Sequence, residues 1–299
     1  MSKVGSAKKV KLNSFDDLFG ANAPAASDQI VNVALSELHT FQNHPFKVSD
    51  DKEMEELAES IRQHGVLMPG IARPRAEGGY ELIAGHRRKH GSELAGKTEM
   101  PVIVREYTDD EATIMMVDTN IQRENILPSE KAKAYKLKYE ALKHQGKKSG
   151  KETGKNTLEQ VGEAAGENSK KVQRYIWLSR LSDQLLQMVD EKKMGVAQGV
   201  DLSFLSEKSQ QLVADAIEQK GAALSMEQSA RLKAYEQKEP LTPAAIQLIL
   251  ETRSLHKRKV TFKTDKLSQY FDERYSSEEI ESVILNLLDE WKKKQEDIQ

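Results

Sequence analysis

The chain has 299 residues, and its 45 Lys and Arg against 47 Asp and Glu give a formal charge of −2. This balance excludes a polycation that binds nucleic acid by bulk attraction, so any basic site must be local. The absence of cysteine excludes disulfides, thiolate metal sites and cysteine nucleophiles, and the seven histidines show no zinc-site spacing. No apolar run approaches the ~20 residues that span a bilayer, so we expect a cytoplasmic protein with no membrane partner.

The composition and patterning predict a multidomain protein. Residues 1–28 are small, polar and unpatterned, which predicts a disordered arm. Residues 29–126 mix strand and helix patterns and are predicted to form a compact α+β domain. A short strand and turn are expected at 30–38, further strands at about 70–74, 80–85 and 100–107, and helices at about 50–64, 86–94 and 109–125.

Three local signals set these boundaries. Asp50 and Glu53 have the spacing of a capping box, and the helix they begin ends at Gly65. The Gly78-Gly79 pair between two strand patterns predicts a hairpin. Apolar stripes are expected on both longer helices, at Met54, Leu57, Ala58 and Ile61 on the first and at Ile114, Met115 and Val117 on the last.

Residues 127–255 are predicted to form an all-helical domain. Ser129 is a candidate N-cap for a helix that runs to about Gln145, followed by an exposed loop rich in Gly and Lys. Residues 131–174 contain twelve Lys and Arg against five Glu, so the neutral total conceals a basic region here. Later helix starts are expected at Ser206, Ser225 and Thr242-Pro243.

A helix-turn-helix is predicted near residues 157–178. Thr157 and Gln160 suggest a capping box, Gly162 permits a close helix crossing, and Gly166 and Val172 follow at the spacing that this motif needs. The alternative is an ordinary helical hairpin with a solvated charged face. The second helix would expose side chains suited to phosphates and base edges, namely Ser169, Lys170, Lys171, Gln173 and Arg174.

Residues 256–299 are predicted to form a C-terminal segment with a short, basic strand and a long amphipathic helix. Ser276 and Glu279 cap this helix, and no later segment remains to cover its apolar stripe. The stripe either folds back on its own domain or pairs with another chain, and we favour a homodimer. Its members are Ile280, Val283, Ile284, Leu287, Leu288 and Trp291.

Two stretches of the α+β domain are candidate sites. In AGHRR, Gly85 stands between a strand and a helix, where a phosphate can approach the backbone, and Arg87 and Arg88 supply donors. The alternative is that these arginines are simply solvated. In DTNIQREN, Asn120 has an amide oxygen suited to a magnesium ion and Arg123 can meet a phosphate; alternatively, both residues cap a helix end.

Together these stretches resemble the ParB-type partition proteins. The resemblance covers about residues 30 to 200 and rests on several motifs in the same order. They read ELAESIRQHGVLMPGIARP, YELIAGHRR, MPVIVRE, NIQREN with PSEKAKAY, and the helix-turn-helix.

The resemblance implies a centromere-binding protein of a bacterial chromosome, plasmid or integrative element, associated with the nucleoid or a plasmid. In that family the N-terminal domain binds CTP with Mg²⁺, the helix-turn-helix binds a palindromic DNA site, and the C-terminal segment dimerises. Nucleotide-driven closure makes a clamp that slides on DNA, and the N-terminal arm engages a ParA-type ATPase. By matching positions, Gly85, Arg87 and Arg88 would contact the triphosphate, with His86 and Arg123 beside them, and Asn120 the magnesium.

The chain departs from the family pattern at three places. His86 and Thr119 replace usual acidic residues, and HPFKVS replaces the usual run that contains QPR. Thr119 removes a carboxylate that could hold the metal or orient water, so CTP hydrolysis is expected to be weak or absent. The alternative function is a ParB-like transcription regulator without a nucleotide switch. A nuclease is not expected, because no Asp/Glu cluster has metal-ligand spacing. The redox chemistry of the related sulfiredoxin fold is not expected either, because it needs a thiolate and the chain has no cysteine.

Overall fold

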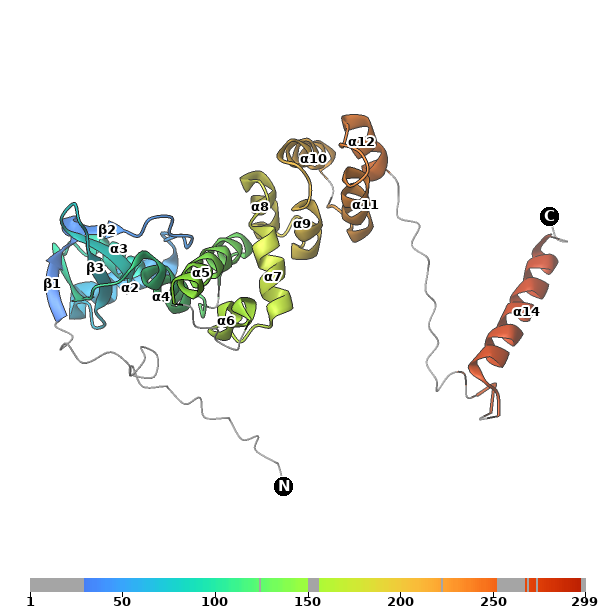
Figure 1. The fold of residues 1–299 in the computed structure, drawn as a ribbon. Helices are drawn as coiled ribbons and strands as arrows, with labels where there is room; N and C mark the ends of the chain where they lie inside the picture. Colours follow the sequence, from blue (N-terminus) through green and yellow to red (C-terminus); the bar gives the residue numbers. More distant parts are fainter. Residues whose placement is uncertain are drawn as a thin grey trace, which may run out of the picture. The chain divides into compact units, whose positions relative to one another are not determined.

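The computed structural model describes residues 30–123, 125–149, 156–221, 223–251, 267, 269–272 and 274–296. These residues divide into two compact units (Figure 1). The first unit contains the described residues up to Glu251, and the second contains those from Leu267 onward.

The first unit begins with a five-stranded sheet. Its strands are β1 (Ile30–Ala34), β2 (Leu38–Thr40), β3 (Gly70–Pro74), β4 (Tyr80–Ala84) and β5 (Glu99–Val104), in the order β1-β5-β3-β4-β2. The β3–β4 pair is the hairpin that Gly78-Gly79 predicts, and β5 lies parallel to β3. Strand β2 was not predicted; it follows a 3-10 turn at Leu35–Glu37 and pairs with β4 in parallel.

Alternating side chains place two hydrophobic clusters on opposite faces of the sheet. Leu82 and Val102 belong to a cluster formed by the strands, whereas Ile83 packs with Met116 of α4 (Asp109–Asn120). The predicted stripe on α4 is partly wrong. Val117 is fully buried as predicted, but Met116, rather than Met115, is the methionine at the centre of the face.

Helices α2 (Lys52–His64) and α3 (His86–Leu94) pack against each other. A Cβ at Gly91 would lie 3.1 Å from the Ile61 Cδ1 atom, which shows how closely α3 approaches α2. Gly65 ends α2 with a φ of 71°, as predicted. The predicted N-cap is wrong by one residue, because the Asp51 side chain, not that of Asp50, accepts the Met54 N–H.

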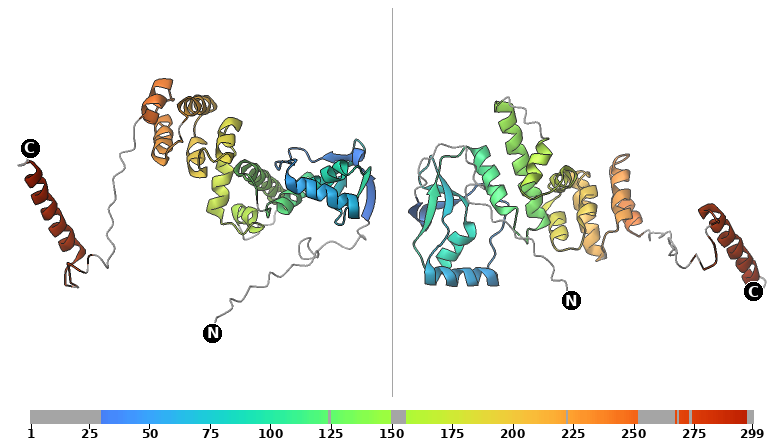
Figure 2. Two further views of the ribbon diagram at one scale, coloured as in Figure 1. Left: turned by 180° about the vertical axis from the view of Figure 1, so that it is seen from behind. Right: turned by 90° about the horizontal axis from the view of Figure 1, so that it is seen from below.

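One hydrophobic core crosses the predicted domain boundary between residues 126 and 127. Helix α5 (Pro128–Ser149) packs against α4 on one side and against α7 (Ser169–Leu178) on the other (Figure 2). Tyr135 of α5 is fully buried in the same cluster as Met116 of α4 and Val172 of α7. The two predicted domains therefore share a packed interior.

Helix α5 corrects two expectations. Ser129 does not cap it: Pro128 is its first residue, and the Ser129 N–H and hydroxyl donate to the Asp190 carboxylate. The helix also continues past the predicted end at Gln145 to Ser149. The rest of the predicted loop, at 150–155, lies outside the described residues.

Two helices, α6 (Thr157–Glu163) and α7, lie at the residues predicted to form the helix-turn-helix. Asn156, not Thr157, is the N-cap of α6, and its side chain accepts the Leu158 N–H. Gly166 has a φ of 63° in the turn, a conformation that favours glycine.

The remaining helices of the first unit pack around a separate cluster that includes Leu185, Leu202 and Leu232. The starts predicted at Ser206 and Ser225 are confirmed by side-chain capping bonds, and Pro243 is the first residue of its helix. These helices are α8 (Asp183–Asp190), α9 (Val196–Leu202), α10 (Glu207–Lys220), α11 (Met226–Glu236) and α12 (Pro243–Glu251).

The second unit contains α14 (Ser277–Glu296), and the predicted Ser276–Glu279 capping box is present. Leu287, Leu288 and Trp291 are each more than half exposed on this helix. The predicted arm at 1–28 and the predicted strand near 259 lie outside the described residues. None of the helices that the structure describes is both long and apolar enough to cross a membrane.

Candidate functional site

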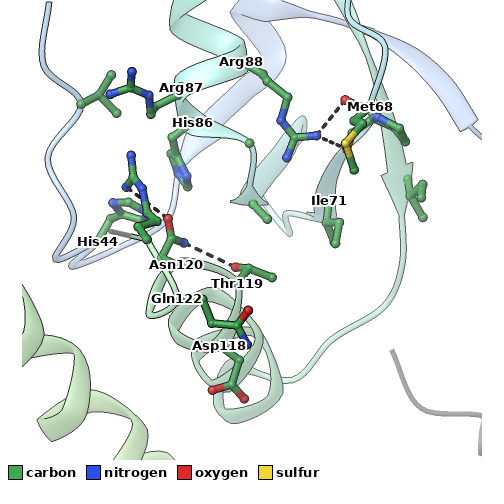
Figure 3. Close-up of a pocket in the computed structure, with 16 residues that line it drawn as sticks. His44, Met68, Ile71, His86, Arg87, Arg88, Asp118, Thr119, Asn120 and Gln122 are labelled. Atoms are coloured by element: carbon green, nitrogen blue, oxygen red, sulfur yellow. Dashed lines mark hydrogen bonds between the residues drawn. The ribbon is translucent and has the colours of Figure 1, made fainter. Parts of the chain in front are cut away.

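All the residues predicted to bind nucleotide line one cleft of about 410 Å³ in the sheet domain (Figure 3). The predicted residues come from two segments far apart in sequence, the start of α3 and the end of α4 with the following turn. The predicted residues that line it are Gly85, His86, Arg87, Arg88, Asn120 and Arg123.

Gly85 makes the sharp connection between β4 and α3. Its φ of 111° lies in the region that glycine favours, and it is the N-cap of α3. A Cβ there would lie 3.2 Å from the Gly70 Cα atom and 3.3 Å from an Arg88 nitrogen. Glycine therefore keeps the backbone open at a helix N-terminus, where an anion is favoured.

Arg87 contacts carboxylates at the start of α2. Its guanidinium donates to Asp51 Oδ1 at 3.3 Å and Oδ2 at 3.4 Å and lies 3.5 Å from Glu53 Oε2. The hydrogen bond from Arg87, together with the Met54 N–H, holds the pKa of the Asp51 carboxyl below its usual value. In this conformation, then, α2 supplies the negative charge that a phosphate would supply.

Arg88 is held by the loop between α2 and β3. Its Nη1 donates to the carbonyl oxygens of Met68 at 2.7 Å and Pro69 at 2.5 Å (Figure 3). Burial lowers the pKa of this guanidinium, but an arginine side chain stays charged at neutral pH. Because neutral carbonyls orient it, Arg88 contributes a fixed positive charge to the cleft.

His86 lies against His44, a residue of the cleft that the sequence did not single out. The ring centroids are 3.9 Å apart, and His44 Nδ1 lies 2.8 Å from the Phe46 carbonyl oxygen. Burial, with nearby positive charges, lowers the pKa of His86 to about 3, and burial also lowers that of His44. Both imidazoles are therefore neutral at pH 7, and neither Nε2 atom has a hydrogen-bond partner among the described residues.

These histidines predict how stability depends on pH. Folded His86 stays neutral down to about pH 3, whereas the unfolded chain binds its proton near the ordinary pKa of 6.5. The stability that neutral His86 contributes is fully present above pH 6.5. As the pH falls towards 3, the free energy of unfolding decreases by about 1.4 kcal/mol per pH unit. Urea unfolding at a series of pH values should show a smaller loss for His86→Gln than for wild type. The exposed His64→Gln is the control, and equal losses in all three proteins would contradict the prediction.

The end of α4 brings Asn120 to the same cleft. Its Nδ2 donates to the Met116 carbonyl at 2.8 Å, and its Oδ1 accepts from Arg123 at 3.4 Å. Thr119, where the resembled family has an acidic residue, directs its hydroxyl to helix carbonyls. Asp118 also lines the cleft, but it pairs with Lys138 at 2.5 Å. Burial raises the pKa of the Asp118 carboxyl, and this effect outweighs the pairing with Lys138, which lowers it.

These groups test the fit of a magnesium ion. No group of three His, Cys, Asp or Glu among the described residues is arranged to hold a metal. Mg²⁺ is often held by few protein groups, with water and substrate phosphates as its other ligands. The Asn120 oxygen fits that pattern as a single protein ligand.

The region around this cleft matches a known family. Residues 21–121 match the family model of the ParB N-terminal domain. This region is a ParB N-terminal domain. The chain is 39% identical over 118 residues to the probable chromosome 1-partitioning protein ParB of Deinococcus radiodurans, a match covering 40% of this chain and 39% of that one.

The chromosome-partitioning protein Spo0J of Thermus thermophilus is 37% identical over 112 residues, with 38% of this chain and 41% of that one covered. The matches thus span about two fifths of these relatives' length. Among solved structures, C-terminally truncated ParB from Caulobacter crescentus complexed to the centromeric parS site has a TM-score of 0.43 and 21% identity, covering 68% of this chain and 98% of that chain. The same protein complexed with CTP-gamma-S has a TM-score of 0.30 and 22% identity, covering 64% and 99%.

Beyond the ParB N-terminal domain, all the predicted DNA-binding residues line a second cavity, of about 670 Å³, at the helix-turn-helix. Helix α7 begins at Ser169, as predicted, with Asn168 as its N-cap. Lys170 and Arg174 are exposed and form no ion pair within the described part of the chain. We name this cavity the DNA groove after the prediction, and the residues predicted to bind DNA that line it are Ser169, Lys170, Lys171, Gln173 and Arg174.

Lys171 differs from the other cations of the DNA groove. It pairs with the buried Glu167 at 2.6 Å, as does Lys131 of α5, and the Tyr135 hydroxyl donates to the same carboxylate at 2.8 Å. Burial raises the pKa of Glu167, but these three bonds together lower it below its usual value. Glu167 therefore fixes the turn of the helix-turn-helix against α5, a role that no local sequence signal indicated.

Proposed function

We propose that this chain is a sequence-specific DNA-binding partition protein that binds CTP with Mg²⁺ through its ParB N-terminal domain. The observation that carries the proposal is the gathering of Gly85, Arg87, Arg88 and Asn120 around one cleft. A glycine at a helix N-terminus, guanidinium groups and an amide oxygen are the chemistry that a magnesium-bound triphosphate needs. The curated relatives of this domain are named as chromosome-partitioning proteins.

The packing offers a route from the nucleotide to DNA. Asn120 is the last residue of α4, α4 packs on α5, and α5 packs on the recognition helix α7. Tyr135 contributes to both contacts, since it is buried beside α4 and donates to Glu167 at the α7 turn. A nucleotide that moves the end of α4 would therefore shift elements already in contact with the DNA groove.

The exposed apolar stripe of α14 supports a homodimer as part of the proposal. A homodimer through this helix would bury Leu287, Leu288 and Trp291 and would present two helix-turn-helix units to a palindromic site. The proposal also includes binding of a ParA-type ATPase by residues 1–28. It further includes association of the protein with the nucleoid, a plasmid or an integrative element.

Calorimetric titration with CTP, GTP and ATP, each with and without Mg²⁺, tests the proposal. We expect saturable binding of CTP that requires Mg²⁺, and more cross-linking between N-terminal domains when CTP and cognate DNA are both present. Absence of binding by every nucleotide would overturn the nucleotide part of the proposal.

A second function is a transcription regulator that binds DNA without a nucleotide switch. It is favoured by Thr119, whose hydroxyl is bonded to its own helix, and by Asp118, whose carboxylate is paired with Lys138. These contacts leave no unpaired carboxylate at the end of α4, among the residues that the structure describes, to orient water, so hydrolysis is expected to be slow or absent. DNA affinity that is identical with and without CTP would favour this second function.

A further inference from the structure

A basic groove of about 360 Å³ lies between α5 and α7, apart from the nucleotide cleft and the DNA groove. Lys136 and Lys143 come from α5, and Arg180 follows the end of α7. Among the residues that the structure describes, Glu140 is the only acidic side chain that lines it. The full lining is Lys136, Tyr139, Glu140, Lys143, His144, Ile176, Ser179 and Arg180.

The three cations of this groove are not neutralised within the described part of the chain. Three other lysines of α5 are each paired with a carboxylate: Lys131 with Glu167, Lys133 with Asp183 and Lys138 with Asp118. Lys136, Lys143 and Arg180 form no such pair with any described residue, although all three are exposed. Three positive charges beside a single carboxylate repel one another, and an anion relieves that repulsion.

Helix α7 joins this basic groove to the DNA groove. Arg180 lies seven residues after Gln173, about 10 Å farther along the same helical path and on nearly the same side. The segment from Ser179 to Arg180 continues the helical turn, because Ser179 has right-handed helical dihedrals. A DNA duplex set against the start of α7 therefore has its backbone directed towards cations at the other end.

We propose that Lys136, Lys143 and Arg180 bind phosphates of the DNA backbone outside the bases that α7 faces. This inference rests on the proposed DNA binding. Lysine and arginine are the usual phosphate ligands, and Lys143 is steadied by the Tyr139 ring, whose centroid lies 5.2 Å from its Nζ. The half-buried Tyr139 and Ile176 give the groove apolar walls suited to deoxyribose. Such contacts strengthen binding to every sequence and discriminate between none.

The test is the salt dependence of affinity for a labelled duplex of random sequence, measured by anisotropy on the full chain. Each lost phosphate contact lowers the slope of log K against log salt by about 0.9. The double variant Lys136→Ala/Arg180→Ala should therefore lower the slope by about 1.8. Lys133→Ala is the matched control, since Lys133 is an exposed lysine of the same helix that pairs with Asp183 at 3.2 Å. It should leave the slope within error of wild type, and circular dichroism confirms that the variants are folded.

The outcomes separate this inference from the proposed function. If Lys170→Ala/Arg174→Ala flattens the slope but Lys136→Ala/Arg180→Ala does not, DNA binding stands and the basic groove has no part in it. If wild type binds no duplex, both are wrong. If the groove variant weakens CTP binding and leaves the salt slope unchanged, the groove serves the nucleotide and the inference is overturned.

Discussion

Gly162→Ala is expected to lower the free energy of unfolding by about 3 kcal/mol and to abolish DNA binding by the helix-turn-helix. A Cβ at this position would lie 2.2 Å from the Glu167 carbonyl oxygen and 2.9 Å from Val172 Cγ2. The Glu167 N–H also donates to the Gly162 carbonyl at 3.0 Å, so the turn between α6 and α7 cannot move away without losing a hydrogen bond. Alanine improves helix propensity by at most about 1 kcal/mol, which is too little to offset the overlap.

Gly146→Ala is the matched control for this prediction. Gly146 is an exposed glycine of α5, and a Cβ there would meet nothing within 4 Å. Only the propensity gain remains, so this variant should be unchanged or more stable by up to about 1 kcal/mol. Urea unfolding followed by circular dichroism measures both. A Gly162→Ala protein as stable as wild type would show that the crossing of α6 and α7 is looser than the structure describes.

Gly162 also shows which parts of the fold the sequence could predict. The positions of a small residue in one helix, a glycine in the turn and Val172 in the next helix predicted the motif, because backbone approach and φ above zero impose strict residue types. The helix caps were less predictable. Asp51 rather than Asp50, and Asn156 rather than Thr157, cap their helices, because adjacent residues of capping type differ only in local geometry.

Long-range contacts explain what the sequence could not predict in the candidate site. Sequence motifs predicted which residues line the cleft, but they did not predict which other residues those side chains contact. Arg87 contacts Asp51, which is 36 residues away in the sequence, and His86 contacts His44, which is about as far away in the sequence. Neither contact has a local pattern. The core around Tyr135 likewise joins two predicted domains, because periodicity shows which face of a helix is buried but not against what.

Arg87→Ala is expected to weaken binding of CTP with Mg²⁺ by about 10-fold to 100-fold. The range follows from the ~1.5–3 kcal/mol contributed by a hydrogen bond to a charged group. The loss should appear as a raised Kd in calorimetry with little change in the melting temperature, since Arg87 is partly exposed and its ion-pair partners among the described residues are exposed carboxylates. Unchanged affinity would show that the start of α3 does not hold the triphosphate.

Asp51→Asn tests the same arginine from the opposite side and should strengthen nucleotide binding a few-fold. Arg87 must leave Asp51 to meet a phosphate, so the carboxylate competes with the ligand. Asparagine keeps the N-cap that accepts the Met54 N–H but carries no charge, so α2 should be preserved while the competitor is removed.

The double variant Arg87→Ala/Asp51→Asn isolates the coupling between these two residues. If Asp51 acts only by holding Arg87, its substitution should have no effect on CTP affinity once Arg87 is absent. If Asp51→Asn strengthens binding equally in both backgrounds, the carboxylate instead repels the triphosphate directly through space. Because that repulsion is screened by salt, the affinity gain from Asp51→Asn in the Arg87→Ala background should then shrink as ionic strength rises.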